Sequence, residues 1–65
     1  METYDLHIWF MDDREICVVK IHEHFVKDNV LHCFTKKSSF GEYNAMNRKI
    51  VGSYPIYNIR TYLPK

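Results

Sequence analysis

The sequence is poor in the residues that build phosphate-binding loops, disulfide frameworks and membrane spans. Only two glycines and two cysteines occur in 65 residues, and no apolar run approaches the roughly 20 residues of a membrane-spanning helix. Without a glycine-rich phosphate loop, the chain offers little support for nucleotide-dependent catalysis. Because an apolar signal segment is also missing, we expect a cytoplasmic protein with no membrane contact, in which Cys17 and Cys33 are buried, reduced thiols.

The charge is nearly balanced, and the apolar content is high. Nine Lys and Arg against eight Asp and Glu give a formal charge of +1, which disfavours sequence-independent binding of nucleic acid. Apolar residues make up 46% and aromatic residues 15% of the chain, so it differs from disordered sequences and should fold. We expect one domain over residues 1–65. A core this small contributes only about 3–5 kcal/mol, which favours self-association into a homo-oligomer.

Alternation of apolar and polar residues predicts the first strand over residues 4–10. Residues 11–14 predict a reversal of the chain, and residues 15–25 predict one long strand. One face of that strand is expected to carry Cys17, Val19, Ile21 and Phe25. Both faces are apolar where it begins and one is polar where it ends, which is typical of a bent strand at the corner of a small barrel.

The rest of the chain predicts a turn, two further strands and one ambiguous segment. Residues 27–29 predict a three-residue turn with Asn29 in the left-handed region, which places Val26 opposite Val30 and His24 opposite His32. A third strand follows over residues 30–36, and residues 36–41 predict a surface loop. Residues 42–51 fit a short helix or a strand, and we favour a strand that ends near residue 51. Gly52 and Ser53 then break the chain before a closing strand over residues 59–63.

The expected fold is therefore mainly β: a small antiparallel β-barrel or strongly bent sheet of four or five strands, with at most one short helix or 3₁₀ turn. The ending supports this, because Gly52, Tyr54, Pro55 and Asn58 resemble the end of Src-homology-3-like barrels. In that family such residues build a 3₁₀ turn before the last strand. The acidic specificity loop, the Ala-Leu-Tyr-Asp-Tyr motif and the paired tryptophans of the family are absent here. Recognition of proline-rich peptides is therefore not implied.

The whole chain also resembles short accessory proteins of bacteriophages and prophages of Gram-positive bacteria. The resemblance lies in a first strand rich in Tyr and Ile and in the ending from Tyr54 to Ile59. It implies a viral protein that acts on the machinery or the immunity of a bacterial host.

Three histidines are the candidate metal ligands. In the register given above, His22, His24 and His32 share one face, so three imidazoles could approach a zinc ion. A fourth ligand is missing, and paired or half-exposed histidines of an amphipathic strand are the favoured alternative. Neither cysteine lies in a setting that would activate a thiolate. We therefore expect no cofactor and no enzymatic activity.

The aromatic residues indicate a binding surface, because ten of them exceed what so small a core can absorb. Trp9 falls on the polar side of the first strand, where a partner could cover it, or it closes one end of the barrel as core. A second patch near the C-terminus is expected to combine aromatic rings with one cation, namely Tyr54, Tyr57, Arg60 and Tyr62. Lysines and arginines beside tyrosines could also stack bases, although solvated strand edges are the favoured explanation.

These observations predict a non-catalytic protein-binding module. The resemblance to phage proteins makes an inhibitor of a bacterial defence system or host enzyme the leading expectation. One alternative is a binder of nucleotides or nucleic acid, including an oligomer that sequesters a signalling nucleotide. The other is a virion assembly protein.

Overall fold

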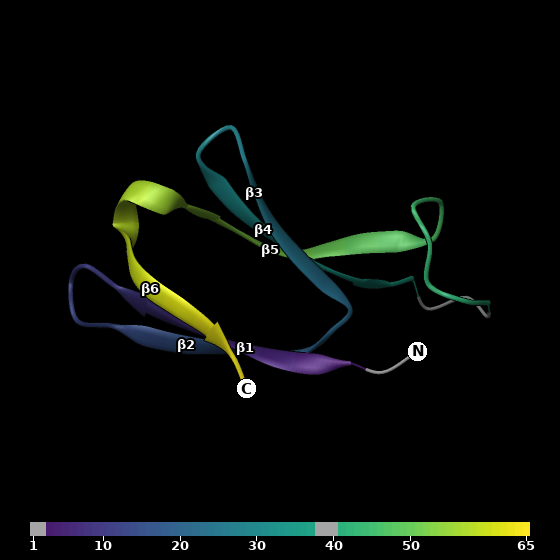
Figure 1. The fold of residues 1–65 in the computed structure, drawn as a ribbon, viewed down its shortest axis with the longest axis horizontal. Coiled ribbons are helices and arrows are strands. Elements are labelled where there is room, and N and C mark those ends of the chain that lie inside the picture. The colour runs from purple at the N-terminus through teal and green to yellow at the C-terminus, as the bar shows by residue number, and fades with distance from the viewer. Residues whose placement is uncertain (1–2, 38–40) are drawn as a thin grey trace.

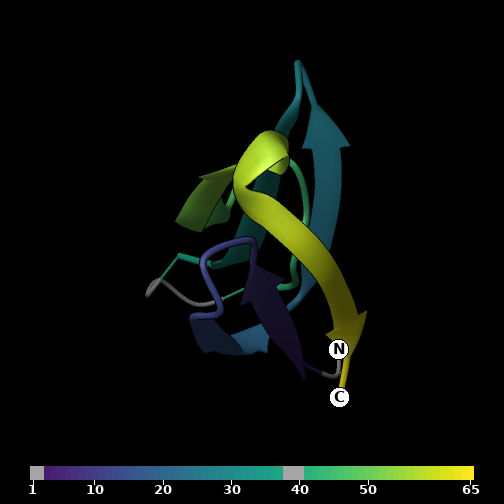
Figure 2. The same cartoon turned by 90° about the vertical axis from the view of Figure 1, so that its left-hand side faces the viewer.

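The computed structural model describes residues 3–37 and 41–65, which form six strands and one 3₁₀ turn (Figure 1). The elements in chain order are β1 (Tyr4–Phe10), β2 (Glu15–Ile21), β3 (Glu23–Lys27), β4 (Val30–Lys36), β5 (Arg48–Pro55), η1 (Ile56–Asn58) and β6 (Ile59–Pro64). They make two antiparallel sheets, β2-β1-β6 and β3-β4-β5, and in Figure 2 the β3–β4 hairpin rises above β1 and β2. The prediction of a mainly β fold is confirmed. The described strands do not close into a barrel, and six strands replace the four or five expected.

The first strand and its turn are as predicted. Leu6, Ile8 and Phe10 are buried on the inner side of β1, because successive side chains of a strand point to opposite faces. The chain reverses after β1, with Asp13 at a φ of 70°. Trp9 then lies opposite Glu15 in an antiparallel pair.

The long strand predicted over residues 15–25 is two strands in two different sheets. β2 contains a bulge, because Tyr4 pairs with Ile21 whereas Leu6 pairs with Val18, which leaves one extra residue on β2. Within this bulge, Lys20 has a φ of 55°. A bulge bends a strand and shifts its alternation by one residue. The prediction that Cys17 and Val19 share a face with Ile21 is therefore wrong. Both are exposed, and of the two cysteines only Cys33 is buried as predicted.

The turn between β3 and β4 has two residues rather than the three predicted. Asp28 and Asn29 have φ values of 53° and 62°, and two left-handed residues in a row match the twist of a tight hairpin. The left-handed Asn29 is confirmed, but the register moves by one. Val26 pairs with Leu31, and His24 pairs with Cys33 instead of His32.

The ambiguous middle segment contains a strand, as favoured, and no helix is found in the described residues apart from η1. β5 starts at Arg48 and continues through Gly52 and Ser53, where a break was predicted, to Pro55. The chain before β5 is a turn held by Asn44 and Asn47, whose side chains bond to nearby backbone. Of the predicted surface loop, residues 38–40 lie outside the described residues. The closing strand is confirmed as β6.

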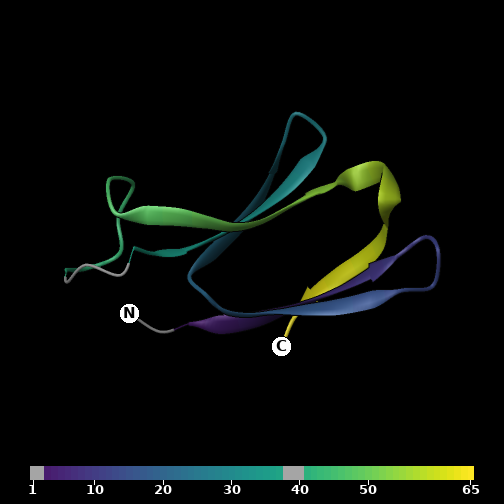
Figure 3. The same ribbon diagram turned by 180° about the vertical axis from the view of Figure 1, so that it is seen from behind.

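The core lies between the inner faces of the two sheets. Its buried members are Leu6, Ile8, Phe10, Ile21, Leu31, Cys33 and Ile59, with Tyr4, Tyr54 and Tyr62 packed around them. β4 and β5 extend beyond this core at one end of the long axis, as seen from behind in Figure 3. The radius of gyration is 12.2 Å, whereas about 11 Å is typical of a compact domain of this length. No helix in the described residues is long and apolar enough to cross a membrane.

Candidate protein-binding surfaces

Trp9 lies on the outer face of the sheet β2-β1-β6, near the end of its central strand β1. Its neighbours across the two ladders are Glu15 on β2 and Thr61 on β6. The imidazole of His7 stacks on the indole, with 3.9 Å between ring centroids and an angle of 10°. Nε2 of His7 is 3.2 Å from Oε2 of Glu15. The alternative in which Trp9 closes the core is wrong, because the buried side of β1 carries Leu6, Ile8 and Phe10 instead.

Apolar side chains lie on both strands beside His7, the residue that stacks on Trp9. His7 pairs with Cys17 on one side and with Leu63 on the other, so these residues share the outer face. Val19, two positions further along β2, is 58% exposed and Leu63 is 57% exposed. We call the surface formed by His7, Trp9, Cys17, Val19 and Leu63 the Trp9 face.

The predicted C-terminal patch is divided between the interior and the surface. Tyr54 and Tyr62 pack against the core, where the ring of Tyr54 meets Phe10 edge-on at 5.9 Å. Burial raises the pKa of Tyr54. Tyr57 on η1 is 75% exposed, and Nη2 of Arg60 is bound to Oδ1 of Asp13 at 2.6 Å. Only Tyr57 and Arg60 are therefore accessible, and Arg60 already has a carboxylate partner.

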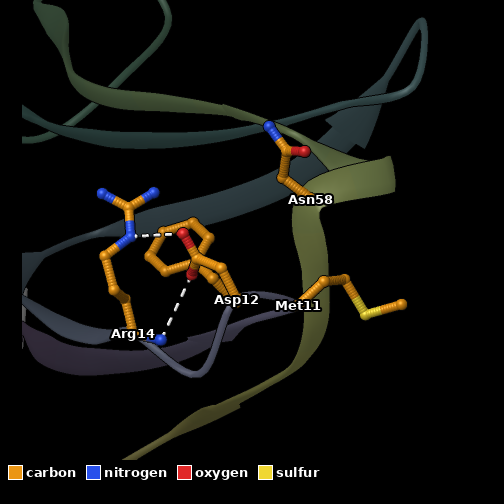
Figure 4. Close-up of a pocket in the computed structure, with 5 residues that line it drawn as sticks. Met11, Asp12, Arg14 and Asn58 are labelled. Carbon is orange, nitrogen blue, oxygen red and sulfur yellow. Dashed lines mark hydrogen bonds and ion pairs between the residues drawn. The ribbon is translucent and has the colours of Figure 1, made fainter.

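A small hollow of about 150 Å³ lies where the β1–β2 turn meets η1 (Figure 4). Met11 and Asn58 line it together with Arg14, whose guanidinium covers the ring of Phe10 at 5.5 Å. Nε of Arg14 donates to Asp12 Oδ2 at 2.7 Å, and hydrogen bonds from the Arg14 amide and side chain lower the pKa of Asp12. Pockets for small molecules usually enclose roughly 300–1,000 Å³. This hollow is too small to hold a nucleotide.

A cluster that sequence reasoning missed joins β3, β5 and the segment before β5. Oε1 of Glu23 accepts hydrogen bonds from the Tyr43 hydroxyl and from Nη1 of Arg48, the latter at 3.0 Å. The hydrogen bond from Tyr43 lowers the pKa of Glu23, assisted by Arg48. Desolvation and the neighbouring carboxylate raise the pKa of Tyr43 to about 12. To predict this cluster from the sequence, one would need the correct β3–β4 register. That register pairs Glu23 with Phe34, which itself pairs with a residue of β5, so Glu23 comes close to β5.

Aromatic rings complete the same cluster. The guanidinium of Arg48 lies 4.8 Å above the ring of Phe34 and 5.9 Å from that of Phe25, and the two phenylalanine rings stack at 5.1 Å. His22 stacks on Tyr43, with 4.8 Å between centroids and an angle of 4°. The arrangement fixes the segment before β5 against the start of β3.

The candidate zinc ligands are not brought together. His24 and His32 occupy opposite faces of their sheet, because His24 pairs with Cys33, the residue next to His32. Each histidine has its own hydroxyl partner instead: Tyr4 for His24 at 2.5 Å, Ser53 for His32 at 3.0 Å and Thr35 for His22 at 3.3 Å. Within residues 3–37 and 41–65, no group of three potential ligands could hold a metal ion.

The two cysteines differ in their surroundings. Cys33 is fully buried, and burial raises the pKa of its thiol, which leaves little reactive thiolate. Cys17 is exposed on the Trp9 face.

Comparison with known proteins adds no further guide: neither a protein-family model, nor a curated protein, nor a solved structure matches this chain.

Proposed function

We propose that this protein is a non-catalytic protein-binding module and that the Trp9 face is its main contact surface. The observation that carries the proposal is the position of Trp9 on the outer side of the central strand, on the same face as exposed Val19 and Leu63. Tryptophan surrounded by smaller apolar contacts is typical of binding hot spots. Exposed apolar side chains that share one face of a small domain favour a partner that covers them.

The local contacts suit Trp9 to this role. The stacked imidazole of His7 restrains the indole, and Glu15 in turn restrains the imidazole. A side chain held in place before binding loses less conformational entropy in the complex. Tyr57 and Arg60, at the end of the molecule near η1, form a second and smaller proposed contact.

For the partner we propose a bacterial defence protein or host enzyme that is inhibited when this domain covers it. The resemblance to phage accessory proteins supports this class of target, and nothing in the site geometry requires a substrate or cofactor. Binding across a flat sheet face would act by steric occlusion.

The proposal can be tested by affinity selection from extracts of Gram-positive bacteria, followed by titration of the purified partner. We expect the wild-type protein to retain a partner that Trp9→Ala and Val19→Ser lose, with affinities at least tenfold lower. Val26→Ser is the matched control, because Val26 is also an exposed valine but lies on β3, outside the Trp9 face. Equal affinities for the wild type and both Trp9-face variants would refute the proposal.

A further inference from the structure

At one end of the molecule β4 and β5 extend beyond the other strands (Figures 1 and 3). Several lysines and one arginine belong to this end. Lys36 pairs with Arg48, and Thr35 pairs with Lys49, across the β4–β5 ladder. The Thr35 hydroxyl donates to the carbonyl oxygen of Lys20 at 3.1 Å, which places the β2 bulge beside them. The backbone N–H of Lys37 donates to Asn47 at 2.6 Å. We call this surface the basic end; its cations are Lys20, Lys36, Lys37, Arg48 and Lys49.

The excess of cationic over anionic side chains in the described residues is concentrated at the basic end. The basic end holds five of the nine cationic residues, and the three carboxylates near it are Asp5, Glu23 and Glu42. One of these, Glu23, is already paired with Arg48. Elsewhere in the described residues, four cations and four carboxylates balance; these are Arg14, Lys27, Arg60 and Lys65 against Asp12, Asp13, Glu15 and Asp28.

Aliphatic side chains lie exposed among these cations. Ile50 is 53% exposed and pairs with Phe34, so it shares a face with Lys36 and Arg48. Met46, in the turn just before β5, is 89% exposed. An apolar contact with a charged rim is the usual composition of a protein interface.

We propose that the basic end binds an acidic segment of a protein partner, with Ile50 as the apolar contact and the lysines as the charged rim. The proposal deepens the function proposed above, since it assumes that the chain binds proteins, but it uses a different surface. A complementary rim raises the rate of association and makes binding depend on salt.

The geometry favours an acidic protein over a nucleic acid. Binding of single strands depends on aromatic ring faces that are free to stack on bases. Tyr43 has one ring face against His22, and Arg48 covers Phe34. Among the residues of this end that the structure describes, the exposed apolar side chains of Met46 and Ile50 are aliphatic and offer no such face.

The test is a fluorescence anisotropy titration with three labelled probes of equal charge. One is a short peptide in which Asp and Glu alternate with Leu and Phe, the second is an oligoglutamate, and the third is an oligothymidylate. We expect the mixed peptide to bind most tightly and to weaken about tenfold when salt rises to about 0.3 M. The double variant Lys36→Gln/Lys37→Gln should lose about tenfold in affinity for it at low salt.

Matched controls separate the basic end from the rest of the molecule. Lys27→Gln removes an exposed lysine outside the basic end and should leave affinity unchanged. Ile50→Ser should lower the affinity for the mixed peptide about tenfold at either salt concentration, whereas Val26→Ser should leave that affinity unchanged. Thermal melts show whether each variant is folded. Trp9→Ala should bind the peptide as the wild type does, so failure of the Trp9 face as an interface would not affect this test.

Three outcomes would overturn the proposal: no binding of the mixed peptide, equal losses in Lys27→Gln and the double variant, or tighter binding of the oligothymidylate. The last would make the basic end a nucleic-acid surface.

Discussion

Tyr43 donates a hydrogen bond to Oε1 of Glu23, although the two residues are 20 positions apart in the sequence. The same oxygen accepts a hydrogen bond from Arg48, so one carboxylate connects β3, β5 and the segment that precedes β5. This carboxylate is therefore a local determinant of stability.

The first prediction is that Tyr43→Phe destabilises the protein by about 1 kcal/mol at neutral pH, as for one hydrogen bond to a partly exposed carboxylate. Folding lowers the pKa of Glu23. The stability that the ionised Glu23 contributes is therefore present above its pKa in the unfolded chain, and it is lost as the pH falls through its lower pKa in the folded protein. The pKa of Tyr43 is raised from 10.0 to about 12, so its contribution is present below pH 10 and lost as pH rises through 12. In thermal melts from acid to alkaline pH, the melting temperatures of wild type and variant should differ most in the middle of the pH range. Tyr57→Phe is the control, and an equal effect there would contradict the prediction.

The sequence predicted well those parts of the fold that are set by local pattern. Strict alternation predicts β1, and a β-prone run between two turns predicts β4. The same alternation puts Trp9 on the polar side of β1 but leaves open whether it is a contact or part of the core. The bulge at Lys20 and the two-residue turn at Asp28 and Asn29 were missed, because each depends on a backbone conformation that several sequences can adopt. Each shifts a register by one residue, and a shift of one residue moves side chains to the other face. The exposure of Cys17 and the separation of the histidines both follow from these shifts.

The second prediction concerns Gly52, which lies under the ring of Tyr54. A Cβ at position 52 would come within 2.7 Å of the Tyr54 ring, so the ring would have to move from its place against the core. We expect Gly52→Ala to cost about 1–3 kcal/mol, measured by thermal or urea unfolding. In the background Tyr54→Ala, the same substitution should cost much less, because the clash is gone. Equal costs in both backgrounds would show that Tyr54 does not lie over Gly52.

The third prediction separates the two thiols. Cys17 is exposed and should react rapidly with a thiol reagent such as dithiobisnitrobenzoate in the native protein. Cys33 is buried and its pKa is raised by burial, so it should react only when the protein unfolds. We expect Cys17→Ser to abolish the rapid phase, whereas Cys33→Ser should leave it intact. If two thiols per molecule of the native wild-type protein react rapidly, the buried position of Cys33 would be contradicted.

The last prediction is that the protein self-associates weakly through the Trp9 face when no partner is present. Self-association is expected because the buried core is small, and three of the four edge strands are poor candidates for it. Bulges interrupt β2 at Lys20, β5 at Val51 and β6 at Arg60, and bulges and charged residues at edges discourage pairing with another chain. The outer face of β2-β1-β6 is the apolar alternative.

Sedimentation equilibrium at tens of micromolar should therefore give an average mass above that of the monomer. Leu63→Glu should return the mass to that of the monomer, because two like charges would meet across a two-fold interface. Val26→Glu adds the same charge outside the Trp9 face and should not change the association. A wild-type protein that sediments as a monomer would contradict self-association, and a dimer that persists in Leu63→Glu would place its interface elsewhere. A protein partner that binds the Trp9 face should dissociate the dimer, so the two equilibria should compete in a titration.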